Sequence, residues 1–358
     1  MEELIRLLYD IPLLGLIFQF IGYLVGIVPD IGPTMLRAAV PITLAAMCAV
    51  MCERSGVVNI GIEGTMLASA FVGWLTGVLV VGSLGGTPTA IFGLTPALLV
   101  AFAAAVVTGL LISTLHAWLS ISVKADQIIS GTIINIAAFG TTGYLNALIA
   151  RTSPAGAGGF RVFSPPPELV DLPVVGWLFD MFLRQGPITM SAVVLLIVLQ
   201  IMLFRSRWGL RTRAVGEHPK AAETVGINVI RLRYRNVIVG GVFAAMGGAF
   251  LSMEATSSFQ DGMTAGRGFI GLAAMIVGRW TPLGAFGAAL LFASSRSIGQ
   301  SIGIRPPPGE LGDFLAGIPG QVYDALPYLV TIIVLAGVVG RSIPPAAVGK
   351  PYERESPA

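Results

Sequence analysis

The sequence has little charge for its length. Charged residues make up 11% of its 358 residues, hydrophobic residues make up 54%, and the mean hydropathy is +0.82. An average soluble domain is about 25% charged, because its surface must be polar enough to cover an apolar core. The composition therefore excludes an ordinary soluble fold and predicts a membrane protein.

Histidine and cysteine are also scarce. His116 and His218 are the two histidines, and Cys48 and Cys52 are the two cysteines. Two distant histidines are too few for a metal site, and no Ser-His-Asp or Cys-His arrangement can be assembled. His116 is expected at a helix end near the membrane surface, and thiols within apolar segments usually serve as packing residues. We expect no metal site and no catalytic site, and hence no enzyme.

What the sequence has in abundance is apolar segments. About ten of them are candidates for transmembrane helices, which need about 20 residues to cross a bilayer. They lie near residues 11–28, 34–52, 57–82, 91–119, 126–149, 188–204, 235–256, 264–278, 282–298 and 326–340. The short segment 264–278 could instead form a re-entrant pair with 282–298, broken at Thr281-Pro282. We predict an all-α, polytopic membrane protein with a single transmembrane domain over residues 1–358.

Positive charge is concentrated in residues 205–235, which have a net charge of +6 against +3 for the whole chain. Loops rich in Lys and Arg stay on the cytoplasmic side of the membrane. The segment is therefore predicted to be a cytoplasmic loop, and its charge is not read as a nucleic-acid patch. Counting spans outward from it places both termini, with the tail 341–358, in the cytoplasm. The segments 150–187 and 299–325 then face outward.

Five polar residues that interrupt the apolar segments are candidates for the substrate path, because polar groups in lipid need a partner or a function. They are Asn59, Glu63, Gln127, Ser130 and Asn135. On a helix, the last three share roughly one face. Glu63 could cap the start of a helix, join two helices or line the path. The glycines beside it indicate a broken helix, which is common around transporter sites.

Residues 216–226, within the basic segment, predict a short helix. Pro219 suits a first turn, Ala221 and Ala222 favour helix, and Gly226 ends it. A helix of two turns is not stable alone in water, so it needs a surface on which to dock. The alternative is an amphipathic helix that lies on the membrane surface, on the same side as the loop that contains it.

The sequence has no pattern for a nucleotide site. Gly349-Lys350 is followed by Pro351, where a phosphate-binding loop needs Ser or Thr. Residues 266–271 spell a dinucleotide fingerprint, but no strand is expected before them, and the glycines favour close helix packing. Any ATP that drives this protein must be hydrolysed by another chain.

Four segments resemble the permeases of bacterial ABC importers for branched-chain amino acids, ribose-type sugars and nucleosides. Residues 214–227 resemble the coupling segment of that family, in which a short cytosolic helix inserts into a groove on the ATPase. Residues 53–66, 125–135 and 268–284 resemble segments of the nucleoside and simple-sugar permeases. The resemblance implies that one group of residues couples to the ATPase: Glu217, His218, Pro219, Lys220, Ala221, Ala222, Glu223 and Gly226.

The resemblance also implies partners and a location. The chain is expected in the inner (plasma) membrane with an ABC ATPase, a second permease of different sequence and an extracytoplasmic substrate-binding lipoprotein. ATP and magnesium would bind to the ATPase, and this chain would need no cofactor. The expected cargo is a nucleoside or related riboside, ahead of simple sugars and of branched-chain amino acids, although no residue reads the cargo directly.

Two other classes of function were weighed against this one. A stand-alone secondary transporter or channel would carry ionisable residues deep in several spans, and only Glu63 and Asp126 qualify. A membrane enzyme would need a cluster of His, Asp or Glu at one membrane face, which the sequence lacks. The docking helix in the basic segment favours the permease.

Overall fold

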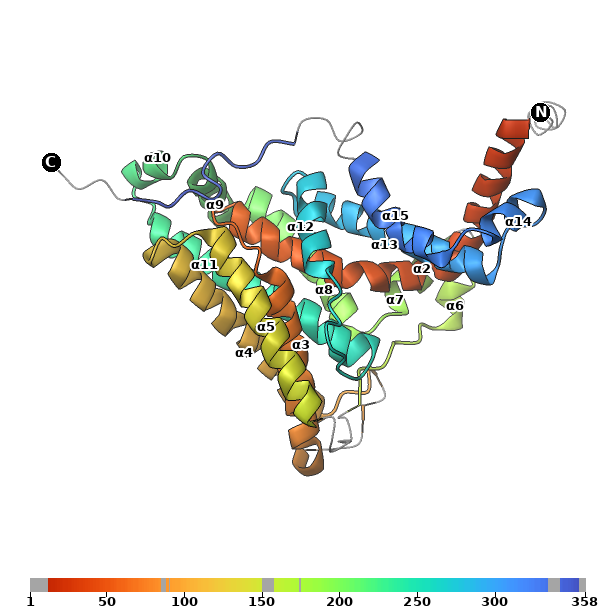
Figure 1. Ribbon diagram of the computed structural model, residues 1–358, viewed down its shortest axis with the longest axis horizontal. Helices are drawn as coiled ribbons and strands as arrows, with labels where there is room; N and C mark the ends of the chain where they lie inside the picture. Colours follow the sequence, from red (N-terminus) through yellow and green to blue (C-terminus); the bar gives the residue numbers. More distant parts are fainter. Residues whose placement is uncertain are drawn as a thin grey trace. The chain divides into compact units, whose positions relative to one another are not determined.

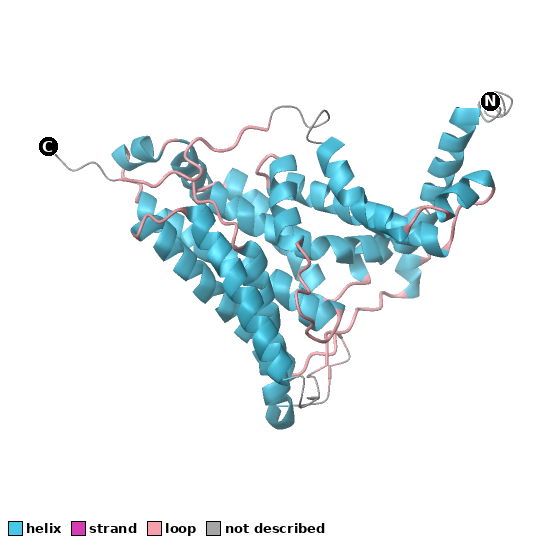
Figure 2. Ribbon diagram, in the orientation of Figure 1, coloured by secondary structure: helices cyan, strands magenta, loops and turns pink. Residues whose placement is uncertain are grey.

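The computed structural model describes residues 12–84, 88–89, 91–149, 158–173, 175–333 and 342–353. These residues form helices and loops without a strand (Figures 1 and 2). Six helical stretches are long and apolar enough to cross a membrane: Phe18–Glu53, Ile62–Leu84, Pro96–Ser122, Gln127–Ile149, Pro187–Arg205 and Val229–Ala255. The all-helical, multi-spanning class is confirmed, whereas the count of about ten spans is not.

The first two predicted spans form one helix. α2 runs from Pro12 to Glu53, although the sequence predicts separate spans at 11–28 and 34–52. The prolines and glycine between them indicate a turn, but membrane helices tolerate such residues when neighbouring groups satisfy the freed backbone. A helix of 42 residues rises about 63 Å, roughly twice the hydrocarbon core. The predicted cytoplasmic N-terminus depends on two separate crossings by residues 11–28 and 34–52. A single continuous helix does not support that count.

The next spans lie close to their predicted segments. They are α3 (Ile62–Leu84), α4 (Pro96–Ala117), α5 (Gln127–Ile149), α8 (Pro187–Arg205) and α11 (Val229–Ala249). α4 and α11 each continue into a short π-helix, Trp118–Ser122 and Phe250–Ala255. α11 begins six residues before the predicted segment, because the side chain of Asn228 accepts a hydrogen bond of 2.9 Å from the N–H of Arg231 and caps the helix. The last part of the predicted loop 205–235 is therefore helical.

The predicted re-entrant pair consists of α12 (Arg267–Val277) and α13 (Pro282–Ile304). The break between them falls at Pro282, as the sequence predicts. α12 has 11 residues and rises about 16 Å, which is half of the hydrocarbon core. α12 alone therefore does not cross the membrane.

Shorter helices complete the described chain: α6 (Pro167–Val170), α7 (Gly176–Leu183), α9 (Arg207–Glu217), α10 (Pro219–Thr224), α14 (Glu310–Ala316) and α15 (Gly320–Ile333). The last predicted span, 326–340, begins within α15. Its residues 334–340 lie outside the described residues.

The chain divides into two compact units. One comprises Met1–Ala39, Ser164–Gln185 and Leu290–Val338, and the other comprises Val40–Phe163, Gly186–Ala289 and Val339–Ala358. In the first unit, Nε2 of Gln185 donates a hydrogen bond of 2.9 Å to the carbonyl of Pro33. All the predicted site residues belong to the second unit.

The second unit is built on α3, α4 and α11, which pack against one another, with α5 beside α3 (Figure 1). Small residues allow the close approach of α4 and α11. A Cβ on Gly109 of α4 would lie 2.5 Å from the Cβ of Ala245 in α11, so a larger residue would push the helices apart. Such small-residue contacts are typical of helices that pack within membranes.

Candidate functional site

The chain between α2 and α3, residues 54–61, is not helical. Backbone groups without helical partners must be satisfied in another way inside a membrane protein. The N–H of Val58 donates to Oε1 of Gln127 at 2.7 Å, and its carbonyl accepts from Nε2 of His116 at 2.9 Å. Side chains from α5 and α4 thus replace the missing helical hydrogen bonds.

Asn135 of α5 forms hydrogen bonds with the backbone at the other end of this segment. Its Nδ2 donates to the carbonyl of Ile60 at 3.1 Å, and its Oδ1 accepts from the N–H of Gly64 at 2.7 Å. The contact requires glycine, because a Cβ on Gly64 would lie 2.7 Å from the Cα of Asn135. A Cβ on Gly131 would likewise lie 2.7 Å from the backbone nitrogen of Gly61. α5 therefore lies directly against the non-helical segment.

His116 lies in the last turn of α4, at a helix end as the sequence predicts, and it is buried. Its side chain is 1% exposed, and Nδ1 lies 3.1 Å from Oγ of Ser130. Because the carbonyl of Val58 can only accept, Nε2 carries the proton and Nδ1 accepts from the hydroxyl of Ser130. These two partners explain how the imidazole is tolerated inside the helix bundle.

Glu63 lies in the first turn of α3 and is fully buried. Its Oε1 accepts from the N–H of Gly266 at 2.7 Å, and its Oε2 accepts from the N–H of Gly268 at 2.6 Å. These N–H groups stand at the start of α12, where the helix dipole favours a negative charge. Gly266 has φ of +79°, which glycine adopts without strain. Glu63 thus caps one helix and joins it to another.

The five predicted path residues are all buried in one region of the second unit. Gln127, Ser130 and Asn135 share the buried face of α5, as the sequence predicts, whereas Thr132 is exposed. Four of the five bond to the backbone of another element or to His116. The fifth, Asn59, has its Nδ2 at 3.9 Å from Sγ of Cys52, and its buried Oδ1 has no hydrogen-bond partner among the described residues. Contact with a transported molecule remains a prediction.

Two further carboxylates, Glu53 and Glu254, are buried without having been predicted from the sequence. Glu254, in the π-helix after α11, accepts from the N–H of Ile188 at 2.7 Å and from Oγ1 of Thr189 at 2.5 Å. These groups stand at the start of α8, so Glu254 caps α8 as Glu63 caps α12. An ionisable residue inside the predicted apolar segment 235–256 was the available signal.

The short helix predicted within residues 216–226 is present over part of that range, since Gly216 and Glu217 belong to α9. α10 spans Pro219–Thr224, and Gly226 follows with φ of +81°. Ala222 is 4% exposed and belongs to an apolar cluster with Val215, Val229, Leu232 and Tyr352. The surface that this short helix needs is therefore supplied by its own chain. Of the other coupling residues, Pro219 and Glu223 are partly buried, and the rest are exposed: Glu217, His218, Lys220, Ala221 and Gly226.

The C-terminal tail, residues 342–353, packs beside the coupling segment, which the sequence did not predict. The N–H of Ala347 donates to the carbonyl of Gly216 at 2.9 Å, and the N–H of Gly349 donates to the carbonyl of Gly56 at 3.2 Å. Nζ of Lys124 and Oε1 of Glu353 form an ion pair of 2.8 Å, which lowers the pKa of the Glu353 carboxyl. The tail and the coupling segment line a groove of about 770 Å³.

The connection between α12 and α13 reaches the same end of the second unit. Nε of Arg54 donates to the carbonyl of Trp280 at 2.7 Å, and Nε1 of Trp280 donates to Oε2 of Glu53 at 2.6 Å. Burial lowers the pKa of the Arg54 guanidinium. α12 therefore runs from the carboxylate of Glu63 to the end of α2.

No group of three or more His, Cys, Asp or Glu side chains that could hold a metal occurs among the described residues. The comparisons with known proteins point to transport instead. The family model for the branched-chain amino acid transport system / permease component matches residues 33–335.

Relatives match over nearly the whole chain. The guanosine ABC transporter permease protein NupQ of Bacillus subtilis is 37% identical over 92% of this chain and 98% of its own. The nucleoside ABC transporter permease protein NupC of Lactococcus lactis is 35% identical over 89% of this chain and 95% of its own. The putative glucose ABC transporter permease protein TsgC13 of Haloferax volcanii is 33% identical over 89% of this chain and 96% of its own. No solved structure matches significantly.

Proposed function

Because the chain belongs to the family of branched-chain amino acid transport system permease components, we propose that it is the membrane-spanning permease of an ABC importer for nucleosides. The observation that carries this proposal is the 37% identity to NupQ over 92% of the chain, together with a similar match to NupC. Both relatives are named for nucleoside transport, at 37% and 35% identity, and the putative glucose permease TsgC13 follows at 33%. Simple sugars are the second candidate cargo.

Uptake by cells tests the cargo. A strain that lacks this gene should lose the uptake of radiolabelled purine or pyrimidine nucleosides and keep the uptake of ribose and leucine. The gene supplied on a plasmid should restore nucleoside uptake. Loss of ribose or leucine uptake with nucleoside uptake intact would contradict the proposed cargo.

The coupling role is assigned to α9, α10 and the residues between them. Six of the eight coupling residues are exposed or stand at the rim of the groove beside the tail, so an ATPase can reach them. The buried Ala222 anchors α10 to its own chain. This anchor would allow α10 to pass movement of the ATPase on to α11, because Val229 and Leu232 of α11 lie in the same cluster.

The proposed partners are an ABC ATPase, a second permease of different sequence and an external binding lipoprotein. Bacillus subtilis has two guanosine permease proteins, NupQ and NupP, and this chain is 26% identical to NupP as well. That similarity supports a pair of unlike permeases in place of two identical ones. ATP and magnesium would bind to the ATPase, and this chain would contribute no catalytic residue.

We assign the five buried polar residues to the substrate path, where they shape the path instead of binding the cargo tightly. Gln127, Ser130 and Asn135 hold the non-helical segment in place, directly or through His116. Glu63 holds the start of α12. A break in one helix and a half-length helix beside it are features that transporters use to build a path near the middle of the bilayer.

The cytoplasmic face is proposed to be the end of the second unit that carries Arg54, Lys124, the α9–α10 segment and the tail. Hydrogen bonds and an ion pair bring these basic segments together, and Lys and Arg favour the cytoplasmic side. The C-terminus then lies in the cytoplasm, and residues 158–173 face outward.

A further inference from the structure

A groove of about 760 Å³ lies where α9, the end of α10 and the start of α11 meet. It is separate from the groove beside the C-terminal tail. Arg211 of α9 and Arg231 and Arg235 of α11 line it, and no Asp or Glu does. Glu223, the acidic residue of α10, lines a neighbouring groove and accepts a hydrogen bond from Tyr352.

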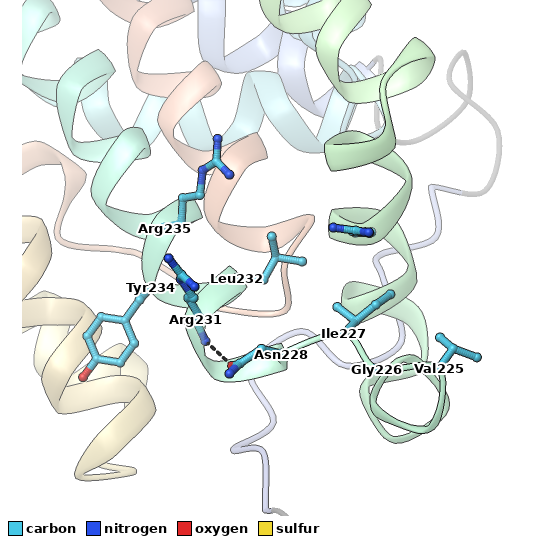
Figure 3. A pocket seen from close by; sticks show the side chains of 9 residues that line it. Val225, Gly226, Ile227, Asn228, Arg231, Leu232, Tyr234 and Arg235 are labelled. Carbon is cyan, nitrogen blue, oxygen red and sulfur yellow. Dashed lines mark hydrogen bonds between the residues drawn. The ribbon is translucent and has the colours of Figure 1, made fainter.

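The three arginines concentrate positive charge in this groove. None of them takes part in an ion pair of the described residues. Arg231 and Arg235 lie one turn apart on α11 (Figure 3), a spacing at which like charges destabilise a helix. The capped start of α11 at Asn228 adds the positive end of the helix dipole. A bound anion would relieve this repulsion.

The groove also lies beside the ends of two candidate spans. α8, a candidate span, ends at Arg205, and the span of α11 begins at Val229. The guanidinium of Arg235 lies 5.8 Å from the ring centre of Trp208, and Tyr234 lines the groove and hydrogen-bonds Ser122 at 2.6 Å. Tryptophan and tyrosine are enriched at the level of lipid headgroups.

An apolar rim lies beside the arginines. Val225, which lines the groove across from α11 (Figure 3), is 75% exposed, and Ile227 and Leu232 line the groove as well. Val225 does not belong to a candidate span. A soluble anion makes no favourable contact with exposed apolar side chains, whereas the glycerol and acyl chains of a lipid can pack against them. Arginine suits the phosphate, because its guanidinium donates two parallel hydrogen bonds.

We propose that this groove binds the phosphate of an anionic phospholipid, with Arg211, Arg231 and Arg235 as the ligands of the phosphate. The groove lies apart from the five path residues, and of the eight proposed coupling residues Gly226 lines it. Its occupant would tie the cytoplasmic ends of α9 and α11 to the membrane surface.

Native mass spectrometry of the purified full-length chain in detergent tests the proposal. The chain is titrated with phosphatidylglycerol and, in parallel, with phosphatidylcholine, and the two affinities are compared. We expect tighter binding of phosphatidylglycerol. Arg231→Gln and Arg235→Gln should each weaken it about fivefold, because a basic residue at an anionic membrane surface contributes about that factor. Arg231→Lys, which keeps the charge, should lose less than Arg231→Gln.

Arg207→Gln is the matched control, because Arg207 is an exposed arginine of α9 that does not line the groove. Equal weakening by this variant would mean diffuse surface charge and no site, and equal affinity for the two lipids would also overturn the proposal. Displacement of phosphatidylglycerol by inorganic phosphate would identify a free anion as the occupant. Groove variants that bind phosphatidylglycerol normally but no longer retain the ATPase in a pull-down would assign the arginines to the protein partner.

Discussion

Oε2 of Glu63 accepts a hydrogen bond of 2.6 Å from the backbone N–H of Gly268, a residue 205 positions further along the chain. The other carboxylate oxygen accepts from the N–H of Gly266. Each of the two N–H groups thus has its own carboxylate oxygen. The start of α3 and the start of α12 are therefore held together by two hydrogen bonds, of which the amide of a glutamine could accept only one.

Replacement of this carboxylate should destabilise the protein. In Glu63→Gln one accepting oxygen becomes an NH₂ group that faces a backbone N–H, so one buried donor loses its partner. We expect the free energy of unfolding to fall by about 1–3 kcal/mol, measured by thermal unfolding of the purified chain. Glu168→Gln, at an exposed carboxylate of α6, should melt like the wild type. Identical melting of the two variants would contradict the capping role.

Asn135→Ala should slow uptake more than it changes the preference for a cargo. The variant leaves the carbonyl of Ile60 and the N–H of Gly64 without their side-chain partner, so the non-helical segment loses its fixed position. Thr132→Ala, on the exposed face of the same helix, is the matched control and should transport normally. The measurement is the initial rate of uptake. Co-purification with the second permease shows whether the variant still assembles.

A set of three variants decides whether the polar residues matter for transport at all. If Asn59→Ala, Glu63→Gln and Asn135→Ala each transport normally, the five polar residues serve only in packing and do not form part of the substrate path. Reduced assembly with normal uptake per assembled complex would place the residues at the permease interface.

The coupling segment should respond differently at two adjacent alanines. Ala221 is exposed and Ala222 is buried. Ala221→Arg should leave the chain folded and lower its association with the ATPase in a pull-down, with loss of uptake. Ala222→Arg places a charge in the apolar cluster and should destabilise α9 and α10 by several kcal/mol, on the order of the cost of an unpaired buried charge. Asp171→Arg, far along the chain from this segment, should do neither. Normal ATPase binding and uptake by Ala221→Arg would remove α10 from the docking surface.

Cysteine labelling should reveal the orientation of the chain. Cys48 and Cys52 are fully buried, so they should add little background. A membrane-impermeant thiol reagent added to intact cells should label Ser164→Cys but not Thr224→Cys, although both positions are exposed. Lys350→Cys, in the tail, should behave like Thr224→Cys. The reverse pattern would invert the topology.

Much of the fold could be predicted from the sequence. The composition and the long apolar segments predict the helical membrane class, because lipid leaves backbone groups no partner outside a helix. Pro219 and Gly226 predict the start and the end of α10, and the helical period predicts the shared face of Gln127, Ser130 and Asn135. These features depend on local chemistry, which the sequence contains in full.

The tertiary structure decided what the local pattern leaves open. Pro29 and Pro33 indicate a turn, yet α2 continues through them, because the cost of a proline in a helix depends on the groups that pack around it. Glu63 had three possible roles in the sequence, and its bonds to the N–H groups of Gly266 and Gly268 show that it caps α12 and joins it to α3. The contact of Ala347 with Gly216 joins residues that are more than 100 positions apart. Such partners are chosen by packing between distant elements, which no short stretch of sequence records.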